Sequence, residues 1–309
     1  MPAASVPTLI VITGPTGSGK TSLAIEIARA IGCDIISADS RQIYKGIPIG
    51  TAAPTAAERA LVRHHFVEEL ELDSYYSAAL FEEQAIKRLN ALWQKGPDVA
   101  VMCGGSMMYV DAVVNGIDPL PTISDEIRAR VLSLYDTEGL DGVCSRLRSL
   151  DPESCDRIDL RNPRRVVHAL EICLQSGRKY SSLCTGTPTE RPFRVLKYAI
   201  DRPRHEMMDR INRRVDAMME AGFENEARSV YHMRHLNSLN TVGFKEMFAW
   251  FDGTMDRATA VARMAKNTRV YAKKQLTWLS RDSSVTWLDP HGASEKILSN
   301  LKSLFNNKC

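Results

Sequence analysis

The residues with the clearest chemical purpose form one glycine-rich segment, Gly14–Thr21 (GPTGSGKT). Its spacing, Gly-x-x-x-x-Gly-Lys-Thr, is that of a phosphate-binding loop, in which backbone N–H groups turn toward phosphate oxygens at the start of a helix. Lys20 can reach a terminal phosphate, and the Thr21 hydroxyl can bind Mg²⁺. An apolar run, Thr8–Thr13, precedes the segment and a helical pattern follows it. The segment therefore predicts a polyphosphate site between a strand and a helix.

The acid that usually completes a nucleoside-triphosphate site is missing from its expected place. Such sites use an apolar strand that ends in Asp to hold Mg²⁺. The strand expected at Val99–Cys103 instead runs into Gly104–Ser106, and Asp98 lies at its other end. This weakens an ATPase interpretation and leaves ATP binding open. Two alternatives stay open as well: a small-molecule kinase, and a P-loop module that binds RNA without catalysis.

A second polar segment, Asp39–Gln42 (DSRQ), follows the short strand expected at Asp34–Ser37. Ligands of open parallel sheets bind beyond the carboxyl ends of the strands. We therefore expect Asp39 beside the phosphate loop, where a carboxylate can serve as a general base or a metal partner. The structural alternative is a helix N-cap, a common position for Asp.

The elements that must position these residues alternate between strands and helices. The patterns predict a helix over Ser77–Trp93, strands over Phe193–Ile200 and Val285–Leu288, and helices over 204–221, 224–235, 245–252 and 257–279. Between about 124 and 175 the pattern is helical with no convincing strand. We predict an α/β fold: a P-loop core with a parallel sheet flanked by helices (1–116 and 196–309), plus an inserted all-helical subdomain (117–195).

The composition is that of a globular protein, with 44% hydrophobic and 25% charged residues among 309. No apolar run approaches the roughly 20 residues that cross a bilayer, and the N-terminus lacks a basic signal region. The seven cysteines form no C-x-x-C pair, which argues against a zinc site or a disulfide framework. We expect a cytoplasmic protein that contacts no membrane and acts as a monomer.

The net charge of +3 conceals a basic C-terminal third, because residues 196–309 hold 19 Lys and Arg against 13 Asp and Glu. Within it, the segment Val261–Arg281 carries Tyr271, Trp278 and six cations, with no acid before Asp282. The cations are Arg263, Lys266, Arg269, Lys273, Lys274 and Arg281. Their spacing favours one helical face that binds an RNA backbone. The alternative is an ordinary solvated face with the aromatic rings turned to the core.

Nine segments spread over nearly the whole chain carry a family pattern. They are GPTGSGKTSLA (14–24), ADSRQIYKGIPIGTA (38–52), YSAALF (76–81), GGSMMY (104–109), DPLP (118–121), RNPRRVVHALEI (161–172), INRRVDAMMEAGF (211–223), NTVGFKE (240–246) and NTRVYAKKQLTWL (267–279). In type and order they resemble the tRNA dimethylallyltransferases, also called tRNA isopentenyltransferases. The resemblance implies transfer of a dimethylallyl group from dimethylallyl diphosphate to the exocyclic amine of the adenosine next to the anticodon on its 3′ side, with release of diphosphate.

The resemblance also implies roles for single residues. Asp39 matches the family's base, and Arg214 matches an arginine that contacts the diphosphate; without the family, Arg214 is an ordinary surface arginine. Lys20, with Mg²⁺ held through Thr21, would neutralise the leaving group. The diphosphate site would be formed by Gly14, Pro15, Thr16, Gly17, Ser18, Gly19, Lys20 and Thr21.

The target adenosine lies in the anticodon stem-loop and must be flipped out of its stack to react. Positions that match tRNA-contacting residues of the family are Asp39, Ser40, Arg41, Gln42, Ser106, Arg128, Arg161, Asn162, Pro163, Arg164, Arg165, Val242, Gly243, Phe244, Lys245, Glu246, Lys273 and Lys274, with the segment 273–280 as a whole.

The chain departs from the family pattern at several positions. Ala53 stands where a lysine is usual, so one cation near the site is absent. Gly243–Glu246 (GFKE) replaces a commoner Gly-Tyr-Arg-Gln pattern, and Ser106 replaces a threonine but keeps the hydroxyl. These changes leave the base, the loop and Arg214 in place.

Overall fold

The computed structural model describes residues 6–184 and 186–306, which divide into two compact units. One unit contains the described residues up to 115 and from 190 onward, and the other contains Gly116–Thr189. The sequence placed the end of the insertion later, at 195. The chain packs on the first unit before that point, because Arg191 forms an ion pair with Glu82 at 2.6 Å and Phe193 packs against Trp93.

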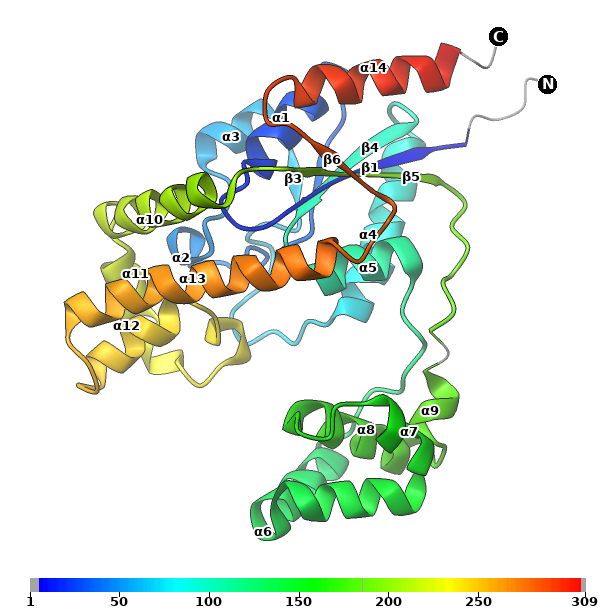
Figure 1. Cartoon of the computed structure of the whole chain (residues 1–309), viewed down its shortest axis with the longest axis vertical. Helices are drawn as coiled ribbons and strands as arrows, with labels where there is room; N and C mark the ends of the chain where they lie inside the picture. The colour runs from blue at the N-terminus through cyan, green and yellow to red at the C-terminus, as the bar shows by residue number, and fades with distance from the viewer. Residues whose placement is uncertain (1–5, 185, 307–309) are drawn as a thin grey trace. The chain divides into compact units, whose positions relative to one another are not determined.

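The first unit is built on a parallel sheet in the order β3-β2-β4-β1-β5-β6 (Figure 1). The strands are β1 Thr8–Thr13, β2 Ile35–Ser37, β3 His64–His65, β4 Val99–Gly104, β5 Arg194–Ile200 and β6 Val285–Leu288. The predicted P-loop α/β fold is therefore confirmed. The edge strand β3 was not predicted, since two residues are too few to show a strand period.

Helices cover both faces of this sheet. They are α1 Lys20–Ile31, α2 Pro48–Thr51, α3 Ala56–Leu61, α4 Ala78–Trp93, α5 Met107–Asn115, α10 Arg204–Glu220, α11 Phe223–Ser229, α12 Phe244–Phe251, α13 Arg257–Leu279 and α14 Ala293–Asn306, with 3-10 turns η1 Tyr231–Met233 and η2 Asn237–Leu239. The helix predicted over 224–235 is instead α11 followed by η1. None of the helices in the described residues is long and apolar enough to cross a bilayer.

The core of this unit has two layers because β1 is buried on both faces. Ile10 and Ile12 pack with α1 and α14, whereas Leu9 and Val11 pack with α4, α5 and the helices α10 to α13. Burial on both faces explains why β1 is a continuous apolar run in the sequence. The parallel direction brings the carboxyl ends of β1, β4 and β2 to one edge, where the polar segments begin.

The second unit is helical throughout its described elements. They are α6 Asp125–Leu150, α7 Pro152–Arg157, α8 Pro163–Ser176 and α9 Tyr180–Leu183. α6 is kinked at Gly139, whose φ of 67° is left-handed. The buried carboxylate of Asp151 accepts hydrogen bonds from the backbone amides of Ser154 and Ser181 and from both hydroxyls, so it fastens α7 to α9.

Two expectations fall on residues that the structure does not describe. The expected lack of a signal region concerns residues 1–5, and the expected lack of disulfides includes Cys309. The other cysteines are free thiols.

Candidate active site

The phosphate-binding loop connects β1 to α1, as predicted. Gly17 and Gly19 have φ values of 86° and 99°, a left-handed conformation that side chains rarely adopt. A Cβ on Gly17 would lie 3.1 Å from the Ile211 side chain, so the loop rests closely on α10. α1 begins at Lys20, which places the helix N-terminus directly under the loop.

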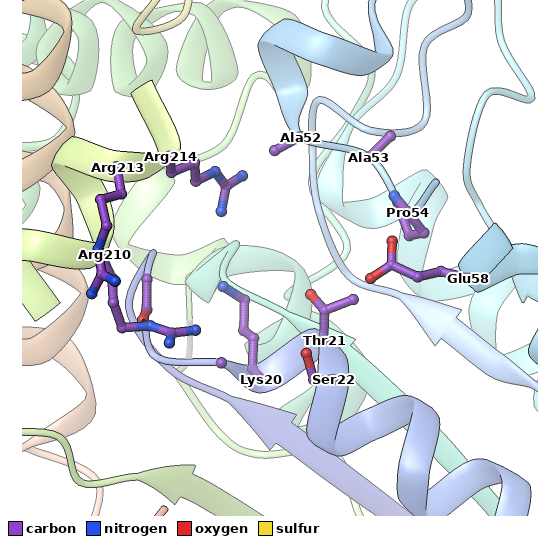
Figure 2. A pocket seen from close by; sticks show the side chains of 12 residues that line it. Lys20, Thr21, Ser22, Ala52, Ala53, Pro54, Glu58, Arg210, Arg213 and Arg214 are labelled. Carbon is purple, nitrogen blue, oxygen red and sulfur yellow. Dashed lines mark hydrogen bonds between the residues drawn. The ribbon is translucent and has the colours of Figure 1, made fainter. Parts of the chain in front are cut away.

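A pocket of about 480 Å³ opens above the loop (Figure 2). Figure 2 shows the side chains of Lys20 and Arg214 pointing into one space, with Thr21 and Glu58 on its other side. The pocket is lined by Gly17, Gly19, Lys20, Thr21, Ser22, Ala52, Ala53, Pro54, Glu58, Arg210, Arg213 and Arg214. Four of these side chains are cationic and one is acidic, so the pocket is suited to a compact polyanion.

The cations of the pocket lower one another's affinity for protons. Burial lowers the pKa of Arg210, and the neighbouring Arg202 and Arg213 lower it further. Burial likewise lowers the pKa of Lys20 and of Arg214, while the charge of Asp39 opposes the change at both. The positive charge is therefore only partly balanced in the free protein, and an anion would relieve the repulsion.

Two arginines that the sequence did not identify form hydrogen bonds to backbone carbonyls of the loop. The Arg210 Nε donates to the Gly17 carbonyl at 2.7 Å, and the Arg202 Nε donates to the Ser18 carbonyl at 3.2 Å. A signal for Arg210 was present, because it stands three and four residues before Arg213 and Arg214 and shares their helical face. Arg202 precedes α10, and no periodicity marks it.

The predicted diphosphate residues do not all face this pocket. Gly17, Gly19, Lys20 and Thr21 line it, whereas Gly14, Pro15, Thr16 and Ser18 do not. The Ser18 hydroxyl is buried and has no hydrogen-bond partner among the described residues. It lies against Gly14, where an added Cβ would come within 2.9 Å of the Ser18 Oγ.

Asp39 follows β2 and lies near the phosphate loop, with only β4 between their strands. Its Oδ1 accepts hydrogen bonds from the backbone amides of Arg41 at 2.9 Å and Gln42 at 3.4 Å. Within residues 6–184 and 186–306, Oδ2 accepts none. The carboxylate is thus held by one oxygen and presents the other, and it caps the turn over residues 40–43 rather than a regular helix.

The neighbours of Asp39 fix its segment. The Ser106 hydroxyl is buried and accepts a hydrogen bond from the Ser40 amide at 2.9 Å. The Arg41 guanidinium donates to the Asn237 carbonyl at 2.6 Å, and the Gln42 amide donates to the Ala52 carbonyl at 3.0 Å. Ser106 and Gln42 therefore position the segment 39–42 and the pocket wall at 52.

Metal binding at the pocket would involve Thr21. No cluster of three or more His, Cys, Asp or Glu side chains that could hold a metal occurs in the described part of the chain. The Thr21 hydroxyl and the Glu58 carboxylate nevertheless line the same pocket. Mg²⁺ commonly takes one or two protein oxygens and completes its shell with waters and substrate phosphates, so these donors fit it.

The basic surface predicted in the C-terminal third lies on α13. Arg263, Lys266, Lys273, Lys274 and Arg281 are exposed, and none of them forms an ion pair with any residue that the structure describes. Arg269 is partly buried, and its guanidinium bonds to the Asn212 side chain. Tyr271 and Trp278 are 40% and 39% exposed. The aromatic rings are therefore not turned to the core, which weakens the structural alternative.

The segment 242–246 lies mostly inside the first unit. Phe244 is fully buried against Phe223, and Glu246 accepts hydrogen bonds from the Gly243 amide and the Asn267 side chain, both at 2.7 Å. Gly243 is buried, Val242 is partly buried, and only Lys245 has an exposed side chain. The replacement at Phe244 therefore falls in the core.

The remaining predicted RNA-contacting residues belong to the second unit. Arg128 is exposed on α6. Arg161, Pro163, Arg164 and Arg165 are exposed at the start of α8, where Asn162 is the N-cap and accepts from the Arg165 amide.

Comparisons with known proteins agree over nearly the full length. The family model described as IPP transferase matches residues 42–282. The chain is 50% identical to tRNA dimethylallyltransferase 1 of Phocaeicola vulgatus, covering 93% of this chain and 96% of that protein. It is also 50% identical to tRNA dimethylallyltransferase 1 of Bacteroides fragilis, covering 96% and 98%.

Solved structures agree in fold. A tRNA isopentenylpyrophosphate transferase from Bacillus halodurans matches with a TM-score of 0.70 and 31% identity, covering 98% of this chain and 96% of that one. A eukaryotic dimethylallyltransferase, captured acting on tRNA, matches with a TM-score of 0.82, covering 97% and 80%. Its identity of 23% makes this a likeness of fold alone.

Proposed function

The chain belongs to the IPP transferase family, and from this premise we propose that it is a tRNA dimethylallyltransferase. It transfers the dimethylallyl group of dimethylallyl diphosphate to the exocyclic amine of the adenosine 3′ to the anticodon and releases diphosphate. The observation that carries the proposal is the cationic pocket above the phosphate loop with the Asp39 carboxylate close by.

The pocket supplies the electrostatic half of the reaction. As the bond from carbon to the diphosphate breaks, negative charge grows on the leaving group. Lys20 and Arg214 both point toward the space where that charge develops, and the helix N-terminus adds to their field. Because these cations are already fixed and partly dehydrated, little reorganisation is needed during the reaction.

Asp39 supplies the base. The adenine amine is a weak nucleophile since its lone pair is delocalised into the ring, so its proton must leave as the new bond forms. The amine nitrogen bonds to the dimethylallyl carbon, the bond from that carbon to oxygen breaks with its electron pair going to diphosphate, and the amine proton passes to Asp39. The free Oδ2 is available for this proton, while Oδ1 stays on the loop amides.

Mg²⁺ fits the proposal as a cofactor. The Thr21 hydroxyl and the Glu58 carboxylate would hold it together with diphosphate oxygens. When bound, the ion would neutralise part of the negative charge that grows on the leaving diphosphate. The residues of the pocket then keep the diphosphate in place and hold its oxygens away from water.

The exposed cations of α13 give the tRNA backbone a place to bind. Lys273 and Lys274 are exposed on this helix and form no ion pair with any residue that the structure describes. Tyr271 lies near enough to Asp39 for that charge to affect it, since burial and then Asp39 raise the pKa of the Tyr271 phenol. A flipped base beside Asp39 would therefore have an aromatic ring near it. We place the enzyme in the cytoplasm with its tRNA substrate, and expect it to act as a monomer.

A transfer assay tests this function. Purified protein is incubated with labelled dimethylallyl diphosphate and unmodified tRNA, with Mg²⁺ and without ATP. We expect label in the tRNA, confined to the adenosine 3′ to the anticodon. Absence of label in the tRNA would overturn the proposal. Consumption of ATP in a separate incubation with a small phosphate acceptor would then favour a kinase.

A further inference from the structure

One polar residue of the basic helix α13 is fully turned away from solvent. Gln275 follows Lys273 and Lys274 directly, yet its side chain is only 2% exposed whereas both lysines are exposed. It lies on the side of α13 that packs inward with Ala272 and Leu279. The resemblance to tRNA-binding segments therefore does not explain Gln275, because its side chain is out of reach of an RNA on the exposed face.

The Gln275 amide bonds to two separate loops. Its Oε1 accepts a hydrogen bond from the Thr16 backbone amide at 2.9 Å, and its Nε2 donates to the Gly105 carbonyl at 2.7 Å. Thr16 belongs to the phosphate loop after β1, and Gly105 belongs to the turn after β4. A primary amide carries its donor and its acceptor on separate atoms, so it can satisfy an N–H of one loop and a C=O of another at once, and Asn is shorter than Gln by one methylene.

These bonds bear on the diphosphate pocket. Thr16 is followed in the loop by Gly17 and Ser18, whose carbonyls accept hydrogen bonds from Arg210 and Arg202. Three side chains therefore hold three successive residues of the loop through their backbone groups. A phosphate loop binds phosphate through backbone amides that point into the loop, so hydrogen bonds that fix its other backbone groups also fix the direction of those amides.

Gly105 lies close to Gln275 and also to Lys20 of the pocket. A Cβ on Gly105 would lie 2.5 Å from the Gln275 Nε2 and 3.5 Å from the Lys20 Nζ. A Cβ on Gly105 would therefore displace the Gln275 amide, whereas its distance to the Lys20 Nζ is that of an ordinary contact.

We propose that Gln275 is a positioning residue for the transfer reaction, which fixes the phosphate loop to the turn after β4 and to the helix that faces the RNA. This rests on the proposed function for its substrate, but the loop geometry itself is independent of it. Gln275 touches neither diphosphate nor base. It acts through the Thr16 peptide and the Gly105 carbonyl, and so it should affect diphosphate binding far more than RNA binding.

The test compares two substitutions on opposite faces of α13. Gln275→Met keeps the length of the side chain and removes both hydrogen bonds, whereas Lys274→Met changes its exposed neighbour. In the full-length protein we measure the Kd for inorganic diphosphate by calorimetry, the KM for dimethylallyl diphosphate, and the Kd for an anticodon stem-loop RNA. Gln94→Met, at an exposed glutamine that follows α4, is the matched control for the substitution itself.

We expect Gln275→Met to raise the diphosphate Kd and the KM by about 10-fold, as follows from a loop misplaced by a fraction of an ångström, with RNA affinity unchanged. Lys274→Met should do the reverse. Gly105→Ala gives a second route, because it displaces the Gln275 amide without removing it, and it should reproduce the diphosphate defect. This variant keeps the proposal testable if Gln275→Met does not fold.

Unchanged diphosphate affinity in folded Gln275→Met and Gly105→Ala would overturn the proposal. So would a loss of RNA affinity in Gln275→Met equal to that in Lys274→Met, since it would make Gln275 an RNA contact. If the wild-type protein binds inorganic diphosphate but transfers no label to tRNA, the proposed function fails and the Gln275 proposal is still decided by the diphosphate titrations.

Discussion

Replacing Arg214 by methionine should make the free protein more stable and its diphosphate binding weaker. Arg214 is partly buried, burial lowers the pKa of its guanidinium, and it forms no hydrogen bond or ion pair with any described residue. Methionine keeps most of the aliphatic packing and removes the charge. A buried polar group without a partner costs about 1 to 3 kcal/mol, and we take the low end because the side chain is partly exposed.

A gain of about 1 kcal/mol corresponds to a rise in Tm of about 2 to 4 °C. The same change removes a charge-assisted hydrogen bond to diphosphate, worth about 1.5 to 3 kcal/mol, so the Kd for diphosphate should rise about 10- to 100-fold. Thermal unfolding and calorimetric titration with inorganic diphosphate measure the two effects. Arg213→Met is the control, because Arg213 lines the same pocket but is exposed, and its Tm should not rise.

A lower Tm in Arg214→Met would refute this reasoning, since it would mean that the guanidinium has a stabilising partner in the free protein. Equal losses of diphosphate affinity in Arg213→Met and Arg214→Met would also refute it, because burial would then make no difference to the contact.

Three further predictions follow from single features. Ala53→Lys restores a cation to the pocket wall and should tighten inorganic diphosphate binding about 5-fold at low salt, an effect that Ala53→Met should lack and high salt should reduce. Burial lowers the pKa of Lys20 from 10.5, so the diphosphate Kd measured against pH should begin to rise below that pH as the amine loses its proton, and a Kd that stays flat to 10.5 would contradict this. In the helical unit, burial would raise the pKa of Asp151, but hydrogen bonds from Ser154 and Ser181 outweigh it and the pKa is lowered from 3.8. The stabilisation by this carboxylate is thus complete above pH 3.8 and is lost as the pH falls through the lowered pKa. Asp151→Asn should lower the free energy of unfolding by about 2 kcal/mol at neutral pH and should make that free energy less dependent on pH in the acid range, as measured by urea unfolding followed by circular dichroism. An unchanged free energy of unfolding in Asp151→Asn would contradict this prediction.

The sequence predicted the elements whose pattern is local. The bounds of β1 and α13 were predicted to the residue, because a continuous apolar run and a long amphipathic helix show their pattern within a short window. The phosphate loop and the placement of Asp39 followed from glycine spacing and from the geometry of parallel sheets.

What the sequence did not predict depends on contacts between distant residues. Thr16 and Gln275 are 259 positions apart, and nothing local to either marks the bond between them. Periodicity could show that one face of α13 is buried, but not that a buried glutamine there ends on the phosphate loop. Phe244 and Glu246 were assigned to an RNA contact by resemblance, whereas the structure buries both.

The central claim is that Asp39 removes the amine proton while the pocket takes the diphosphate. The most direct measurement is the single-turnover rate of transfer in Asp39→Asn, with tRNA bound beforehand and its affinity measured in parallel. Asparagine keeps an oxygen for the amides of Arg41 and Gln42 but is not a base. We predict a rate lower by about 10²- to 10⁴-fold with tRNA affinity nearly unchanged. An unchanged rate of the chemical step, with weaker tRNA binding, would show that Asp39 is a contact and would contradict the account.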